Sequence, residues 1–313
     1  ALNCVGIAQQ LQRSGAVPVF ICHAGFTGVF AEYGFKEYHL PSLQNTNQKT
    51  EETWQTFVTT HLEHFNQTPL EQLATYVAPT WEAIVDTAIQ AEADLETLLK
   101  RIKPDAIVLD NVIMFPAIAN AGVPWIRVVS CAETEIPDKN VPPYLSGMAT
   151  RDPMRGKFED VYVTTTASAH KRYNRFRLAC GLKALPDRQF LETSPHLNLL
   201  LAPSAIRYDR ATSLPEETFV FLEGCVREEA HFDPPTLPIN NGPIVYLSFG
   251  SLGAIDTALI SRMIHVFATL PARFYVNVGG FLERYDQVPD NVFLGSWFPQ
   301  PSIVEQAALF IHH

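Results

Sequence analysis

The chain has 313 residues, of which 47% are hydrophobic and 18% are charged. This composition is typical of a globular protein with room for two domains. The net charge of −10 excludes broad electrostatic binding to nucleic acid or to an anionic membrane. No apolar run reaches the roughly 18 to 20 residues that a membrane-spanning helix needs, and no secretory leader opens the chain. We therefore expect a cytoplasmic protein with no membrane span and no nucleic-acid partner.

Helices and strands alternate from the start of the chain. Residues 2–13 place apolar side chains about three apart on one face, which predicts an amphipathic helix. The apolar run at 17–22 predicts a strand, and the segments 25–35 and 36–41 predict a short helix and another strand. This order is typical of an α/β domain.

The middle of the chain continues the alternation. Residues 51–102 predict one or two long helices with a break at Pro79. Two apolar runs, 106–109 and 125–130, are bounded by polar residues or turns, as expected of parallel strands covered on both faces. A further helix is predicted from about Ala167 onward.

A proline-rich segment, 231–243, separates two parts of the chain. Its Pro and Asn-Gly content predicts an extended linker between domains. Further strands and one helix are predicted on both sides of it, the strands within 196–204, 218–224, 243–253, 273–280 and 291–296 and the helix at 256–270. We therefore predict two doubly wound parallel-sheet domains, at 1–230 and 244–313.

Several residues follow the predicted strands of the second domain, where open parallel sheets bind ligands. Gly250 and Ser251 form a small turn before a helix, which suits a phosphate, although such turns are more often structural. Trp297 follows another strand and offers either a core side chain or a flat surface for a base. His313 ends the last strand and could donate to a diphosphate oxygen or to a backbone carbonyl.

Two segments, VYLSFGS (245–251) and NVFLGSWFPQPSIVEQAALFIHH (291–313), resemble the nucleotide-binding domain of the family 1 UDP-glycosyltransferases, in particular the soluble macrolide-glycosyltransferase branch. In that family W-x-P-Q opens the UDP-binding signature, and a histidine at the next strand end precedes a Gly-Gly turn. Segments 2–21 and 104–126 are similar to the first domain of the same family. The resemblance spans nearly the whole chain and implies a GT-B fold, in which two Rossmann-like domains face a central cleft.

The resemblance assigns roles to individual residues of the second domain. Trp297 would stack on uracil, the Phe298 backbone would lie at the base edge, and Gln300 would lie near the base or ribose. Ser251, in the Gly250 turn, and His313 would hold the diphosphate.

In the first domain, Asp110 would orient the catalytic histidine. In the family that histidine precedes the position of Asn3, and the Gly-Gly turn and the sugar-reading residues follow that of His313. The resemblance therefore implies that both chain ends are truncated, that the second domain is incomplete, and that this chain lacks its own base.

The implied reaction is an inverting transfer of a hexose to a hydroxyl of a small lipophilic acceptor, with UDP-glucose as the expected donor. The acceptor is expected against segments 45–80 and 132–165, near Trp81, Met114 and Phe115. We expect no cofactor besides the UDP-sugar substrate and no metal, since no Asp-x-Asp occurs and the five cysteines lack metal-binding spacing.

Two alternatives remain open at this stage. A UDP-sugar epimerase of the same fold would bind the donor and need no acceptor pocket. A non-catalytic nucleotide-binding fragment would lack the base and the sugar site altogether.

Overall fold

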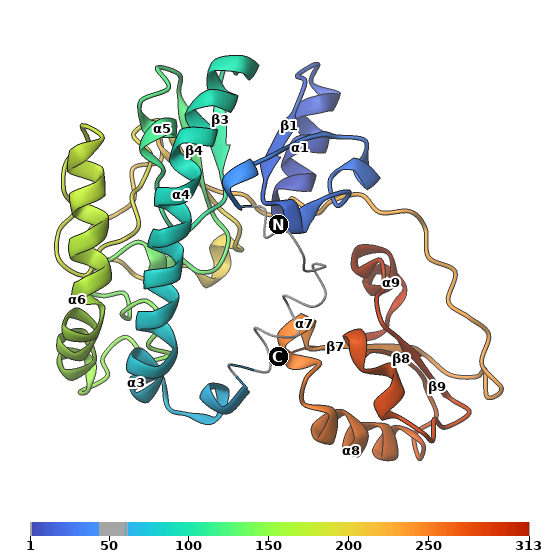
Figure 1. Ribbon diagram of the computed structural model, residues 1–313. Coiled ribbons are helices and arrows are strands. Elements are labelled where there is room, and N and C mark those ends of the chain that lie inside the picture. The colour runs from blue at the N-terminus through green and yellow to red at the C-terminus, as the bar shows by residue number, and fades with distance from the viewer. Residues whose placement is uncertain (1, 44–59, 61, 313) are drawn as a thin grey trace. The chain divides into compact units, whose positions relative to one another are not determined.

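The computed structural model describes residues 2–43, 60 and 62–312, with the side chains of a few of these left out. The chain divides into two compact units, Ala1–Cys225 and Val226–His313 (Figure 1). The segment 231–243, predicted as a linker, groups with the second unit. Both units are built from parallel strands and helices, so each is described by itself.

The first unit contains two parallel sheets. One pairs β1 (Val19–Cys22) with β2 (Lys36–His39). The other has the order β3-β4-β5-β6. Its strands are β3 (Ile107–Leu109), β4 (Trp125–Val129), β5 (Leu197–Leu200) and β6 (Phe219–Phe221). All of them lie within segments predicted as strands.

Helices cover these strands. The α-helices are α1 (Asn3–Arg13), α3 (Pro69–Gln72), α4 (Ala78–Ile102), α5 (Pro116–Ala119) and α6 (Arg155–Ala179). Short 3-10 helices lie at Ala24–Phe26, Ala31–Tyr33, Pro41–Leu43, Leu62–Asn66, Glu133–Glu135 and Ser204–Ile206. The long helices α4 and α6 run side by side (Figure 1). Their facing sides bury the largest apolar cluster of the unit together with β3.

α6 begins at Arg155, twelve residues before the predicted start near Ala167. Its first half contains a run of threonines, and β-branched residues have low helix propensity. In the structure Thr164, Thr165 and Thr166 each donate to a backbone carbonyl one turn earlier, at 2.6 to 2.9 Å. These hydroxyls are satisfied within the helix, so the threonines are compatible with it.

Helical structure is continuous from Pro69 to Ile102, but its geometry changes within it. Residues Leu73–Val77 form a π-helix, and α4 starts directly after them. Pro79 is the second residue of α4, so the proline, which has no N–H to donate, lies directly after the π-helix where the hydrogen-bonding pattern changes. The part of the predicted helix at 51–59 lies outside the described residues.

The second unit is a four-stranded parallel sheet in the order β10-β7-β8-β9. Its strands are β7 (Ile244–Ser248), β8 (Arg273–Asn277), β9 (Val292–Gly295) and β10 (Leu309–Ile311). Its helices are α7 (Gly250–Gly253), α8 (Thr257–Phe267), α9 (Gln300–Gln306) and the 3-10 helix Gly279–Arg284. Asp256 caps α8 by accepting from the Leu259 N–H at 2.9 Å. Apolar clusters cover both faces of the sheet, as parallel sheets require.

Among the described residues, no helix combines the length and the apolar character that crossing a membrane would demand.

Candidate active site

The donor side of the predicted site lies at the carboxyl edge of the sheet in the second unit. Ser248 of β7 lies beside Asn277 of β8, which in turn lies beside Gly295 of β9. β10 pairs with the other side of β7 in the same direction. The four strands therefore end at one edge, where the N–H groups of the following turns can hold a ligand.

The strand order reverses between β7 and β10. From β7 the chain adds β8 and β9 on one side, and it then returns to place β10 on the other side of β7. Ligands of open parallel sheets bind at such a reversal. Gly250 follows β7 there with a φ of 66°, a left-handed conformation that favours glycine. The side chain of Ser251 and all of His313 lie outside the described residues, so their contacts stay predictions.

A small polar network fixes the turns at this edge. The Asn277 amide donates to Ser248 Oγ at 3.4 Å, and the Gly279 N–H donates to Asn277 Oδ1 at 3.0 Å. Gly279 has a φ of 55°, and a Cβ there would lie 3.3 Å from the Cβ of Ala254. The turn after β8 therefore lies close to Ala254, the residue that follows α7.

Trp297 and Phe298 follow β9 and have opposite environments. Trp297 is 59% exposed, whereas Phe298 is 2% exposed. The Phe298 ring packs edge-on against Tyr246 and Phe293, with ring centroids 5.5 and 6.1 Å apart. A buried ring thus anchors the backbone directly beside an exposed indole, whose face is free to stack on a flat ligand.

The position of Trp297 suits a nucleotide whose phosphates lie near Gly250. Trp297 follows β9, which is two strands away from β7, a separation of about 10 Å. This is comparable with the separation of the base and the diphosphate in a nucleotide. Gln300 is the first residue of α9, three positions after the indole. The contacts predicted for Gln300 and for the Phe298 backbone stay predictions.

Asp110 follows β3 in the first unit. It accepts a hydrogen bond of 2.7 Å from the hydroxyl of Ser130, which follows the neighbouring strand β4. Cys4, in the first turn of α1, also lies beside Asp110: burial, and then the Asp110 carboxylate, raise the pKa of the Cys4 thiol to about 12. Asp110 is therefore placed at the carboxyl edge of its sheet, next to the start of α1.

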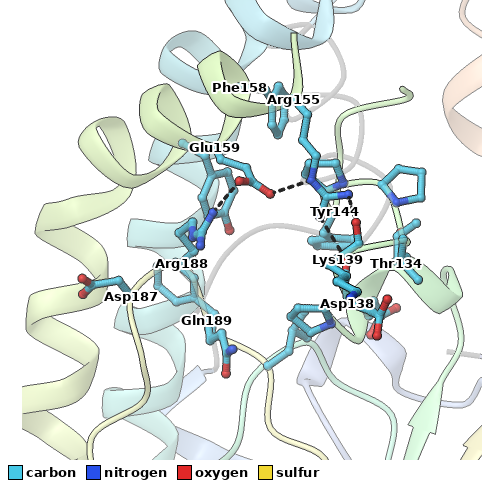
Figure 2. A pocket seen from close by; sticks show the side chains of 18 residues that line it. Thr134, Asp138, Lys139, Tyr144, Arg155, Phe158, Glu159, Asp187, Arg188 and Gln189 are labelled. Atoms are coloured by element: carbon cyan, nitrogen blue, oxygen red, sulfur yellow. Dashed lines mark hydrogen bonds and ion pairs between the residues drawn. The ribbon is translucent and has the colours of Figure 1, made fainter. Parts of the chain in front are cut away.

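A cavity of about 480 Å³ lies in the first unit, within the range of small-molecule sites (Figure 2). Its walls come from residues 134–144, from the first two turns of α6 and from residues 187–191. The aromatic side chains of the walls are Tyr144, Phe158, Tyr162 and Phe190. An apolar ring system would find suitable contacts here.

Three charged side chains at the cavity, Arg155, Glu159 and Arg188, pair with one another. Glu159 accepts from Arg155 Nε at 3.1 Å and lies 2.7 Å from an Arg188 guanidinium nitrogen. Arg155 also donates to the backbone carbonyls of Lys139 and Asp138, at 2.8 and 3.0 Å (Figure 2). Since these charges largely offset each other, the cavity favours a neutral ligand with hydroxyl groups over a charged ligand.

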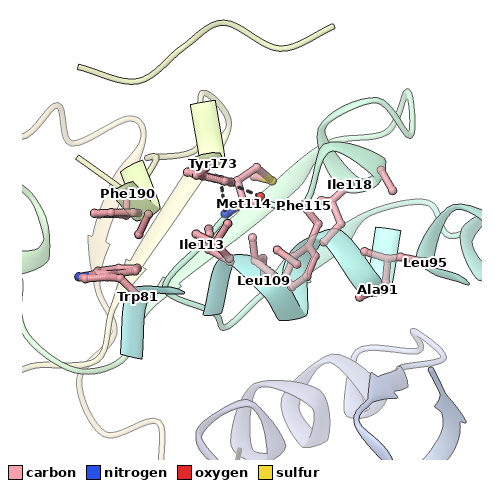
Figure 3. Close-up of a cluster of buried hydrophobic side chains, with 14 of the residues drawn as sticks. Trp81, Ala91, Leu95, Leu109, Ile113, Met114, Phe115, Ile118, Tyr173 and Phe190 are labelled. Carbon is pink, nitrogen blue, oxygen red and sulfur yellow. Dashed lines mark hydrogen bonds between the residues drawn. The ribbon is translucent and has the colours of Figure 1, made fainter. Parts of the chain in front are cut away.

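The residues predicted to contact the acceptor are in the core. Met114 and Phe115 are 0% and 8% exposed and pack with α4 and β3 (Figure 3). Trp81 is 3% exposed and stacks on Phe190 with ring centroids 4.0 Å apart. Trp81 therefore supports a wall of the cavity from behind, and none of the three lines it. Their burial does not favour direct contact with an acceptor.

The sequence reasoning missed Ser130 and the wall segment 187–191. Ser130 could have been found from the sequence, because it directly follows the strand next to the one that Asp110 follows. Phe190 lies in an irregular stretch with no periodicity, so no local pattern marks it. Tyr144 lies in the segment 132–165, which was expected near the acceptor. The other expected segment, 45–80, lies partly outside the described residues.

Comparison with known proteins gives one related sequence of known activity. The chain is 24% identical over 232 residues to oleandomycin glycosyltransferase of Streptomyces antibioticus. The match covers 73% of this chain and 51% of that protein, so the chain spans about half the length of this curated relative. No known family model matches the chain.

The solved structures that are similar to this chain include glycosyltransferases. The glycotransferase of kitacinnamycin superposes with a TM-score of 0.63 and 17% identity, covering 99% of this chain and 71% of that one. The glycosyltransferase SsfS6 of Streptomyces sp. SF2575, complexed with thymidine diphosphate, gives a TM-score of 0.56 and 14% identity, covering 99% and 72%. At these identities the likeness shows the fold, and the predicted α/β class with Rossmann-like parallel sheets is confirmed. The chain is thus similar in sequence to a macrolide glycosyltransferase and similar in fold to glycosyltransferases of known structure.

Proposed function

We propose that the protein transfers a hexose from a pyrimidine nucleoside diphosphate sugar to a hydroxyl of a small lipophilic acceptor. The observation that carries this proposal is the exposed indole of Trp297 at the sheet edge where the strand order reverses. The sequence relationship to oleandomycin glycosyltransferase supports the reaction class.

The donor is proposed to be UDP-glucose, as the W-x-P-Q segment implies. Uracil and thymine differ by one methyl group, and the face of an indole accepts either ring. The related structure of SsfS6 contains thymidine diphosphate, so a dTDP-sugar is the donor to compare. In either case Ser251, His313 and nearby N–H groups would offset the charge that develops on the departing diphosphate.

The acceptor is proposed to bind in the cavity between α6 and the loops 134–144 and 187–191. Its aromatic walls and paired charges support a neutral, ring-containing alcohol or phenol. The acceptor oxygen would attack the anomeric carbon from the side opposite the nucleotide, which inverts that centre.

Asp110 is proposed to orient the histidine that accepts the proton of the acceptor hydroxyl. A carboxylate in this role holds the imidazole in one tautomer and stabilises its charged form. Its position beside the first turn of α1 supports this role, because the resemblance places the base just before that turn. The Ser130 hydroxyl, 2.7 Å away, would keep the carboxylate in place.

The test is a transfer assay with UDP-glucose and dTDP-glucose, each with and without a phenolic acceptor. We expect a glucosylated acceptor and free nucleoside diphosphate with one of the two donors. Isomerised sugar nucleotide without transfer would instead identify an epimerase. Nucleotide binding with no turnover of either donor would identify a binding fragment.

A further inference from the structure

Three side chains of metal-ligating type converge on the two-stranded sheet of the first unit. β1 and β2 pair in parallel, so that Cys22 lies beside His39 and Phe20 lies beside Glu37. Glu37 and His39 are two residues apart and therefore point to the same face of the sheet. One ligand atom each from Cys22, Glu37 and His39 lie within 4.8 Å of one another.

The hydrogen bonds of His39 leave a lone pair directed into this cluster. Its Nδ1 lies 3.4 Å from Thr27 Oγ1, and the Thr27 hydroxyl donates to the Ala24 carbonyl at 2.6 Å. The Thr27 oxygen can therefore only accept from the ring, which assigns the hydrogen to Nδ1. In the neutral ring, Nε2 then carries a lone pair that faces Glu37 Oε2 at 3.2 Å.

Glu37 is held in place as a carboxylate acceptor. It accepts from the backbone N–H groups of Gly28, Phe30 and Ala31 at 2.9, 2.7 and 3.0 Å. The lone pairs of His39 Nε2 and Glu37 Oε2, 3.2 Å apart, repel each other unless a cation lies between the two atoms. Either a second proton on His39 or a metal ion meets this requirement.

Cys22 favours the metal ion. Its side chain is 8% exposed, and no hydrogen bond of its thiol is found within the described residues. A proton shared by His39 and Glu37 gives this buried sulfur no partner. A metal ion bound by the same two groups does, because a thiolate is a strong ligand and metal binding displaces its proton.

We propose that Cys22, Glu37 and His39 bind a Zn²⁺ ion. One sulfur, one imidazole nitrogen and one carboxylate oxygen form a ligand set that zinc uses in proteins. In a tetrahedral zinc site the nitrogen and oxygen ligands are about 3.3 Å apart, and here they are 3.2 Å apart. The sulfur lies within 4.8 Å of both of these atoms and would be the third ligand.

The surroundings fit such a site. Thr27 accepts from the ring nitrogen that does not bind the metal, and backbone N–H groups orient the carboxylate, as outer contacts do in zinc proteins. The His39 side chain is 24% exposed, which leaves room for a water as the fourth ligand. The ion would clamp the two strands and the turn between them. None of these residues belongs to the proposed donor or acceptor sites.

The test is Zn²⁺ binding to the metal-stripped chain, measured by competition with a chromophoric chelator and by native mass spectrometry. We expect one bound ion per chain and binding about 100-fold weaker in Cys22→Ser and in His39→Gln. The matched controls are Cys131→Ser and His23→Ala, an exposed cysteine and the histidine next to Cys22. Both should bind Zn²⁺ as the unchanged chain does.

Replacement of zinc by Co²⁺ tests the sulfur ligand directly. A thiolate-to-cobalt charge-transfer band should appear in the near ultraviolet and be lost in Cys22→Ser. If Cys22→Ser does not fold, as judged by circular dichroism, the partly exposed His39→Gln variant still decides the matter. Absence of a bound ion, or equal affinity in His39→Gln and His23→Ala, would overturn the proposal.

Discussion

The ring of Phe298 occupies the space that a side chain at Gly295 would need. A Cβ at Gly295 would lie 2.6 Å from both Cε2 and Cζ of that ring. Gly295 ends β9, and Phe298 anchors the turn that presents Trp297. The glycine therefore sets how closely this turn folds back on its strand.

Gly295→Ala should lower both stability and nucleotide affinity. The added methyl group forces the Phe298 ring to move, and overpacking of this kind costs about 1–3 kcal/mol. The displaced turn would carry Trp297 with it. Urea unfolding and UDP titration measure the two effects. Gly156→Ala, where a Cβ meets nothing within 4 Å, is the control and should cause neither loss.

Trp297→Ala should weaken binding of UDP or dTDP by about 10- to 100-fold, since base–aromatic stacking contributes about 1–3 kcal/mol. Stability should change little, because the indole is 59% exposed. Isothermal titration calorimetry and thermal denaturation separate the two quantities. Val266→Ala, at a residue of α8 that is 57% exposed, is the control. Unchanged nucleotide affinity in Trp297→Ala would refute the proposed donor site.

Asp110→Asn should reduce the rate of sugar transfer by about 10²- to 10⁴-fold, as loss of the acid partner does in other histidine-base sites. The asparagine can still accept from Ser130, so the fold and donor affinity should persist. Steady-state kinetics with saturating donor measures the effect. Asp105→Asn, exposed just before β3, should leave the rate unchanged. A full rate in Asp110→Asn would remove Asp110 from the mechanism.

Glu92→Gln should stabilise the protein at alkaline pH. Burial raises the pKa of Glu92 to about 7, and one carboxylate oxygen has no hydrogen-bond partner among the described residues. Ionisation of Glu92 is therefore less favourable in the folded chain than in the unfolded chain. The resulting loss of folding stability begins near pH 4.5, grows as the pH rises to about 7 and is complete above that range. Glutamine does not ionise, so the variant does not lose this stability.

Because solvent screens this partly exposed side chain, the expected gain from Glu92→Gln is about 1–2 kcal/mol at pH 8 and close to zero at pH 4. Denaturation at both pH values measures it. Glu216→Gln, at an exposed residue outside α4, is the control and should show no such difference. An equal effect of Glu92→Gln at both pH values would contradict the assignment.

The parallel strands could be predicted because buried strands read as short apolar runs bounded by polar residues, as in 106–109 and 244–248. The positions of Asp110 and Trp297 at strand ends followed from the same pattern. The start of α6 could not be predicted, because its threonines are satisfied only once the helix has formed.

Tertiary contacts explain the remaining differences. Trp81 was expected to line the acceptor pocket, but its side chain points into the core and stacks on Phe190, more than a hundred residues later in the chain. The cluster of Cys22, Glu37 and His39 escaped notice because its spacing arises from strand pairing and matches no short motif. Such relationships exist only in the folded chain.

The stack of Trp81 under Phe190 also bears on how the range of acceptors could diversify. Phe190 lines the cavity, while Trp81 packs behind it and does not line the cavity. A smaller side chain at position 81 would let the Phe190 ring move toward the core. The cavity would become deeper while the residues that line it stayed the same. Evolution or an engineer could thus retune which alcohols are accommodated from inside the core, leaving every exposed contact unchanged.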